Sequence, residues 1–254
     1  MNSDWWKGLV VPAVLLGLAE LAMRFHGSVS MSLAAPTDIV IAFGRVLLNG
    51  SLLAATGGTL VSAGAGLIFG GFIGLLLGIL FGLLAIVDRV MEVTIEAIRP
   101  IPSVAVLPIA MLIFGFGYRM EIAIVAFSCL WPVMIMTRAA VGGIEPRLLE
   151  VSRALRLSAV DRVIKVVLPA ALPRIMVAFR LAAGIALVVA VTVEIAVNPL
   201  GLGYGILVAQ QALQPDVMLA YLVWIGVIGW GLNVLLSLAQ NRLFGRAGQV
   251  EVVR

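Results

Sequence analysis

The sequence predicts an all-α integral membrane protein with six transmembrane helices. Of its 254 residues, 62% are hydrophobic and 12% are charged, whereas a soluble domain averages about half apolar and about a quarter charged residues. The mean hydropathy is +1.16. Long uncharged intervals divide the chain into segments that can hold spanning helices of roughly 20 residues. These observations exclude a water-soluble globule.

The first expected span is the apolar stretch Gly8–Ala19. Glu20 and Arg24 follow it four residues apart, so they can pair on one helix face. A cleaved secretory signal peptide is the alternative, because Lys7 precedes a short apolar region. Asp4 within the basic region and the distance to the nearest small-residue site, Ser32-Leu33-Ala34, favour a retained helix.

The second span is expected at 60–87, after an interfacial segment at 37–48 and a break at Asn49-Gly50-Ser51. Glycines recur at every fourth position of this span, which places them on one stripe where a neighbouring backbone can approach closely. They are Gly66, Gly70, Gly74, Gly78 and Gly82. We expect this stripe to form a packing seam inside one subunit rather than a dimer contact.

Four more spans follow. The third, 100–118, contains three prolines and is expected to be kinked, with Glu96 and Arg99 paired at its inner end. The fourth covers 122–137, the fifth runs from Pro173 to just before Asn198, and the sixth covers 217–241. The resulting division is 1–59 (first helix and interfacial segment), 60–244 (core, with a loop at 138–174) and 245–254 (tail).

The distribution of basic residues predicts that both termini lie in the cytoplasm. With the 138–174 loop inside, three of the 17 Lys and Arg residues would lie outside, namely Arg24, Arg45 and Arg119. Cytoplasmic loops carry the excess of basic residues in membrane proteins. The net charge of +4 therefore sets topology and does not indicate nucleic-acid binding.

The 138–174 loop carries the expected function. Pro146 can open a helix at its first position, and Leu148, Val151 and Leu155 recur at helical spacing. Ser158 and Asp161 resemble a capping box for a second short helix, which Leu168-Pro169 would close. A helix this short needs a partner groove for stability. It would lie in a second protein, on its own protein or on lipid headgroups.

Several motifs resemble those of ABC importer permeases. The stretch from Glu150 to Arg156, continued by Val166-Val167-Leu168-Pro169, resembles their EAA loop. Further similarity to the nitrate/sulfonate/taurine branch covers residues 60–244 and includes Arg99-Pro100-Ile101-Pro102, Phe114-Gly115-Phe116-Gly117, Trp131-Pro132 and Gly201-Leu202-Gly203-Tyr204. Two departures stand out: Val151-Ser152 replace two alanines, and Arg156 occupies the usual glycine position.

The resemblance implies a type I ABC importer permease in a bacterial inner membrane. Such a chain forms a homodimer, pairs with two cytoplasmic ABC ATPase subunits and receives a small organic anion (a sulfonate, taurine or nitrate) from an extracytoplasmic binding protein. ATP and magnesium would bind in the ATPase. The lysines of this chain, Lys7 and Lys165, are not followed by Ser or Thr as a Walker A motif requires. We therefore expect no enzyme activity, cofactor or metal site in this chain.

The resemblance also assigns candidate residues. Glu150 is expected to act as a polar contact with the ATPase or as a cap. Leu149, Ala154 and Leu157 are expected to face the ATPase groove. The full coupling set is Pro146, Leu149, Glu150, Arg153, Ala154, Arg156, Leu157, Leu168 and Pro169. The translocation or gate candidates are Glu194, Met111, Phe114, Met134, Gly201 and Tyr204. Glu194 shapes the path or holds a gate, or else it reaches the outer interface.

Three other classes compete. An ion-gradient-driven secondary transporter would need interrupted helices in paired halves, and no matching half-repeat is visible. A membrane enzyme is disfavoured because one His and one Cys exclude most metal and Cys–His designs. A scaffold would leave the projecting amphipathic loop without a role. The residue pattern does not identify the transported substrate.

Overall fold

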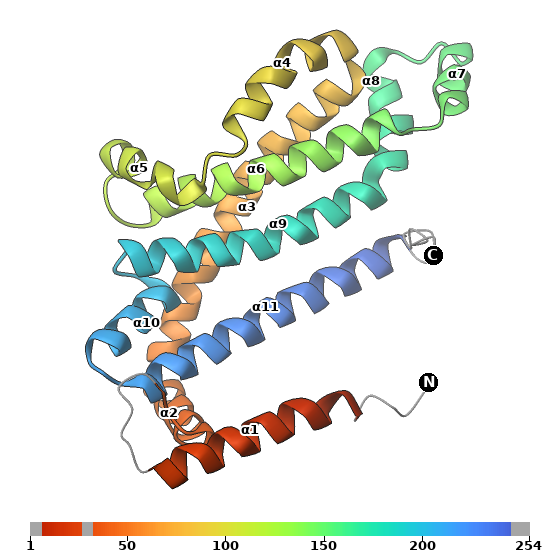
Figure 1. Cartoon of the computed structure of the whole chain (residues 1–254). Coiled ribbons are helices and arrows are strands. Elements are labelled where there is room, and N and C mark those ends of the chain that lie inside the picture. The colour runs from red at the N-terminus through yellow and green to blue at the C-terminus, as the bar shows by residue number, and fades with distance from the viewer. Residues whose placement is uncertain (1–6, 27–32, 245–254) are drawn as a thin grey trace.

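The structure is a computed structural model that describes residues 7–26 and 33–244, and these ranges are dominated by helices (Figure 1). In chain order they are α1 (Lys7–His26), α2 (Pro36–Leu48), α3 (Ser51–Leu83), α4 (Ala85–Ile98), η2 (Ser103–Val106), α5 (Leu107–Phe114), α6 (Tyr118–Gly142), α7 (Pro146–Ala154), α8 (Ala159–Arg162), η3 (Val163–Val167), α9 (Leu168–Ala196), α10 (Gly201–Gln211) and α11 (Pro215–Phe244).

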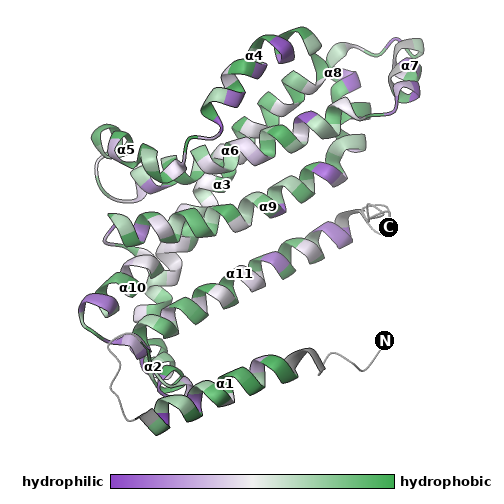
Figure 2. Ribbon diagram, viewed as in Figure 1, coloured by the Kyte–Doolittle hydropathy of each residue, from purple (hydrophilic) through white to green (hydrophobic). Residues whose placement is uncertain are grey.

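Four helices in the described ranges are long and apolar enough to cross a membrane: α3, α6, the run from α8 through α9, and α11. The pair formed by α4 and 103–114 passes the same test when its two parts are taken together, as a broken span or a re-entrant loop, and is here called the broken span. Figure 2 shows apolar residues along most of α3, α6 and α9, with hydrophilic residues around α4, α7 and α8. The chain is thus a multi-pass membrane protein. A sixth span depends on α1 and stays a prediction.

The core lies where α3, α6 and α9 pack together, and the glycine stripe of α3 explains how closely they approach. A Cβ added at Gly66 or Gly78 would lie 2.5 Å from side-chain atoms of Val125 or Thr137, both on α6. At Gly70 an added Cβ would overlap the backbone of Ala126. The predicted packing seam inside one subunit is confirmed.

The second span begins earlier than predicted. The break at Asn49-Gly50 is present, with Gly50 at a positive φ of 77°, but α3 starts at Ser51 rather than at residue 60. Residues 52–59 contain no proline, so nothing stops the helix there. Gly58 packs closely against Gly201 and Tyr118. The proposed division at 59/60 therefore falls inside one helix.

The third span differs most from its prediction. Instead of one kinked helix over 100–118, the chain forms α4, a break at 99–102, and then η2 and α5. The two parts are bent by 82°. Pro100 and Pro102 lack the backbone N–H groups that a continuous helix needs, so the helix ends before them. Arg99 consequently lies inside the broken span and not at its inner end.

The fifth span also begins earlier than predicted. Leu168-Pro169 does not close a separate short helix, because α8, η3 and α9 continue as one run over Ala159–Ala196. The segment Val163–Val167 is a π-helix. Its wider turn accommodates the missing N–H of Pro169 without a break. Pro173 likewise lies inside α9.

The first residues of α1, the loop helix α7 and the last residues of α11 lie toward the same end of the bundle (Figure 1). The loop from Val197 to α10 and the turn between α10 and α11 lie at the opposite end. This arrangement agrees with a topology in which both termini share the side of α7, here called the inner end.

Candidate functional site

At the inner end, α7 stands away from the bundle (Figure 1), and apolar side chains on and directly after this helix are exposed. Leu148, Val151 and Leu155 are 44%, 56% and 67% exposed. Ser152, on the neighbouring part of the helix surface, is 1% exposed and turns toward the protein. The loop is therefore held by its own protein on one side and offers an apolar stripe on another.

The exposed stripe differs from the set of residues that the sequence predicted to face a groove. Leu157, expected in the groove, is half-buried, whereas Ala154 and Glu150 are exposed. The side chains of Leu149 and Arg153 lie outside the described residues. Leu148 and Val151 of α7, together with Leu155 directly after its last residue, are thus the large exposed apolar side chains in the described part of this segment.

The end of α7 is closed by Arg156 in the left-handed conformation. Its φ is 52°, and the N–H of Leu157 donates to the carbonyl of Ser152 at 3.1 Å, the six-residue closure of a Schellman turn. Glycine adopts this conformation without strain, whereas other L-residues lose roughly 1–2 kcal/mol. Arg156, which occupies the usual glycine position of the EAA-loop pattern, thus adopts the left-handed conformation that glycine favours.

This strain yields a prediction. Arg156→Gly should stabilise the turn by about 1 kcal/mol, and Arg156→Val should destabilise it further because a β-branched residue is an outlier at positive φ. Hydrogen exchange of the peptide covering 146–162 should slow in the first variant and quicken in the second. As a control, Arg147→Gly should quicken exchange, because it places glycine inside the helix. Equal exchange in R156G and R156V would contradict the assignment.

The second half of the loop is tied to the membrane helices. Ser158 caps α8, accepting from the N–H of Asp161 at 3.1 Å and donating to its carboxylate at 2.6 Å, as predicted. The Lys165 ammonium forms an ion pair with the Asp161 carboxylate at 2.6 Å. Leu168 packs on a cluster that includes Val141 and Ile175, while Pro169 is exposed. Movement of α7 therefore passes directly into α6 and α9.

At the outer end, a buried polar cluster joins four parts of the chain. Glu194 of α9 is 1% exposed. It accepts from the Thr59 hydroxyl of α3 and from the backbone N–H of Gly203, both at 2.7 Å. Thr59 in turn accepts from the N–H of Leu202 at 2.9 Å. Glu194 thus fixes the first turn of α10 and does not reach the outer interface.

The same cluster contains Glu121, which the sequence analysis assigned no role. Glu121 is fully buried and accepts from the Asn198 side-chain amide. The predicted fourth span began at residue 122, so this acid fell just outside it. The position of this acid directly before an apolar run was the signal in the sequence that could have identified Glu121.

Glycines let α10 close over this cluster. Gly201 has a φ of 84°, and a Cβ at Gly201 or Gly203 would overlap Glu194. Residues 198–204, which comprise the loop before α10 and its first turn, therefore form a tightly packed cap whose geometry depends on small residues.

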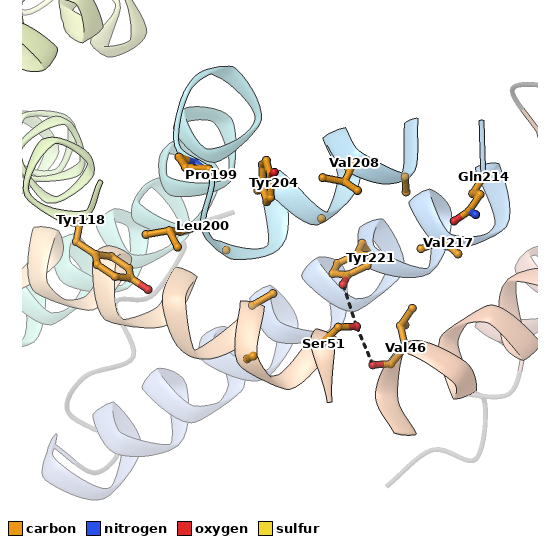
Figure 3. A pocket seen from close by; sticks show the side chains of 15 residues that line it. Val46, Ser51, Tyr118, Pro199, Leu200, Tyr204, Val208, Gln214, Val217 and Tyr221 are labelled. Carbon is orange, nitrogen blue, oxygen red and sulfur yellow. Dashed lines mark hydrogen bonds between the residues drawn. The ribbon is translucent and has the colours of Figure 1, made fainter. Parts of the chain in front are cut away.

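Beside this cap is an open cavity of about 450 Å³ (Figure 3). Tyr204, Tyr118 and Tyr221 contribute rings to its lining. Tyr221 donates to Ser51 at 3.4 Å, and Ser51 donates to the carbonyl of Val46 at 3.3 Å. Of the predicted gate residues, Gly201 and Tyr204 are thus brought together at one outer cavity.

The remaining pathway candidates are dispersed. Met134 is 1% exposed and packs in a core cluster with Phe81, so it lines no path in this structure. Met111 is partly buried against the core. Phe114 is 46% exposed at the end of α5.

A bundle of apolar helices with a rigid projecting helix at one end and a capped cavity at the other defines a membrane transport component. The family model for the binding-protein-dependent transport system inner membrane component matches residues 70–248. The chain belongs to this family: it is a transmembrane permease of an ABC importer, and ATP hydrolysis lies in a separate subunit.

Relatives and solved structures agree. The chain is 30% identical over 239 residues, covering 94% of itself and 87% of the other protein, to SsuC of Bacillus subtilis, a putative aliphatic sulfonates transport permease protein. It is 29% identical to the taurine transport system permease protein TauC of Escherichia coli, covering 64% of itself and 59% of TauC. Its fold matches an inward-facing MetNI methionine ABC transporter with a TM-score of 0.66 at 24% identity, covering 76% and 94% of the two chains.

Proposed function

We propose that the chain is the permease of an importer for a small anion such as a sulfonate, taurine or nitrate, placed in a bacterial inner membrane. The names of its relatives support this substrate class, since they include sulfonate, taurine and nitrate permeases. The partners are two cytoplasmic ABC ATPase subunits, which bind ATP and magnesium, and an extracytoplasmic binding protein. Two copies of the chain form the pathway between them.

The observation that carries this proposal is the exposed apolar stripe of α7 on a rigidly held loop. A helix that lays such a stripe into a groove is a recurring recognition mode. Closure of the ATPase dimer would draw two such helices together and shift the permease between its inward- and outward-facing states. Moving such an equilibrium from 1:99 to 99:1 takes about 5.5 kcal/mol, which the loop transmits to α6 and α9.

The outer end suits the binding protein. The cap at 198–204 is tightly packed and lies beside a cavity lined by Tyr204, so a docked protein could release its ligand there. Specificity for one anion would then depend mostly on that protein. A thermal-shift screen of the partner binding protein against methanesulfonate, taurine and nitrate would identify the cargo, with no stabilisation by any anion contradicting the substrate class.

Glu150 provides a test of coupling. It is exposed on α7, next to Val151 of the apolar stripe in the chain, where the wall of a groove that holds the stripe can contact it. Glu150→Lys should lower ATP-dependent uptake by about tenfold or more while ATP hydrolysis continues, because reversing a charge at a contact is costly.

Glu145→Lys is the matched control, since Glu145 is an equally exposed acid outside α7. Uptake and hydrolysis are measured together in proteoliposomes containing permease, ATPase and binding protein. Unchanged uptake by E150K with normal subunit assembly would contradict the role of Glu150.

A further inference from the structure

Arg99 occupies an unusual place for a charge. It follows the last residue of α4, at the break in the broken span. Among the described residues, no hydrogen bond or ion pair joins it to another side chain, and the expected pair with Glu96 does not form. Its side chain is exposed on the surface of the single chain.

The neighbours of Arg99 show how deep it lies. They line one cavity of about 290 Å³ and include Ser128 and Trp131 from α6, with Val189 from α9. Trp131 is 13 residues from Tyr118 and 11 residues from Gly142, the two ends of α6, so it lies near the middle of a helix about 37 Å long at 1.5 Å per residue. A bilayer core is about 30 Å thick. The cavity is therefore near the middle of the membrane.

A charge at this depth cannot face lipid cheaply. An arginine at the centre of a spanning helix is costly to insert, and such residues face a bundle interior or a water-filled cavity. Irregular backbone at membrane depth is subject to the same restriction, and Arg99 adjoins the irregular segment 99–102. The charge of Arg99 and the irregular backbone at 99–102 therefore both place the surface around Arg99 on the pathway side of the subunit.

The cavity has the chemistry of an anion site. Arg99 is the one charged residue among the described residues that line it, and no acid is present there. The Trp131 indole N–H is buried without a hydrogen-bond partner in the described part of the chain. Ser103, also on the wall, adds a hydroxyl. A guanidinium with nearby neutral donors in an apolar wall matches the planar or tetrahedral oxygens of a small anion.

We propose that Arg99, with Trp131 and Ser103, forms a mid-membrane binding site for a small oxyanion on the translocation path. The inference deepens the proposed function and rests on it for the direction of transport. In a homodimer the site occurs twice, once in each subunit. It gives the permease its own selection for anions, beyond that of the binding protein.

The test uses iodide, an anionic quencher of tryptophan fluorescence, as the probe. The full-length chain carries Trp131 as its single tryptophan, with Trp5, Trp6, Trp224 and Trp230 replaced by Phe, and is placed in nanodiscs. Quenching by iodide is compared with quenching by neutral acrylamide. No ATP, ATPase or binding protein is present, so the result does not depend on the proposed function.

Arg99→Gln should lower the iodide quenching constant of Trp131 by at least about threefold, because the local field no longer concentrates anions. Acrylamide quenching should stay unchanged, which verifies that the cavity is still formed. Arg99→Lys should keep most of the iodide effect, and Arg242→Gln, at the inner end of α11, should keep all of it.

Equal iodide quenching in R99Q and the parent would overturn the site. It would also be overturned if, in the parent, acrylamide quenched Trp131 and iodide did not, or if neither quencher reached Trp131. If ATP-dependent anion uptake were nonetheless observed, the proposed function would stand without this site. Strong Arg99-dependent quenching in a chain that shows no ATP-driven uptake would support the anion site and contradict the proposed importer function.

Discussion

Gly70→Ala should destabilise the permease by about 1–3 kcal/mol, the usual cost of inserting a methyl group into a filled core, and should reduce the yield of monodisperse protein. The reason is geometric. The added Cβ would overlap the backbone of Ala126, and backbone atoms cannot move aside as a flexible side chain can. To accommodate one carbon, α3 and α6 must separate along their shared seam, which loosens contacts at Gly66 and Gly78 as well.

The control for this variant is Gly64→Ala on the same helix. A Cβ at Gly64 meets nothing within 4 Å, so the substitution should stabilise the protein by about 0.5–1 kcal/mol through helix propensity. Thermal unfolding midpoints of the two purified variants should therefore move in opposite directions. If the unfolding midpoints of both variants rose, the seam would not be closely packed. The account would then lack its evidence for a rigid connection from α7 through α6 to the core.

Leu155→Asp should abolish assembly with the ATPase, lowering the affinity of permease for ATPase by about 100-fold or more. Leu155 is 67% exposed at the end of the apolar stripe. Burying a leucine in a groove contributes about 1.5–3 kcal/mol, and burying an unpaired carboxylate there adds a desolvation cost of several kcal/mol. Because Leu155 is exposed in the permease itself, the substitution should leave the fold of the permease intact.

Leu213→Asp is the matched control. Leu213 is 60% exposed at the outer end of the bundle, in a turn where its φ of 56° suits aspartate. It receives the same charge change far from α7. Co-purification of an ABC ATPase with the tagged chain should fail for L155D and succeed for L213D. Normal co-purification with L155D would show that the stripe does not hold the ATPase.

The sequence predicted features that depend on local chemistry. Hydropathy located the apolar segments, the four-residue glycine spacing predicted a packing seam along the second span, and Ser158 with Asp161 predicted a helix cap. These features are determined by neighbouring residues and by simple periodicity, so one chain suffices to recognise them.

Features that depend on tertiary packing were not predicted. A π-helix absorbs Pro169, so a proline that would stop an isolated helix lies inside a continuous one. Glu121 and Glu194 are separated by 72 positions in the chain, and hydropathy does not show that both join one buried cluster. Arg99 was expected at the inner end of a kinked span, but a break at 99–102 replaces the kink and leaves Arg99 between the two parts of the broken span. Such outcomes follow from contacts between distant segments.

The most direct test of the account is the energy source of transport. Proteoliposomes holding the permease, its ATPase and its binding protein are loaded with ATP on the ATPase side, and uptake of the labelled anion is followed with and without ion gradients. We expect uptake that requires ATP, the binding protein and an intact α7, and that persists when every ion gradient is collapsed. Anion flux through the permease alone, driven by an ion gradient without ATP, would contradict the account and identify a secondary transporter.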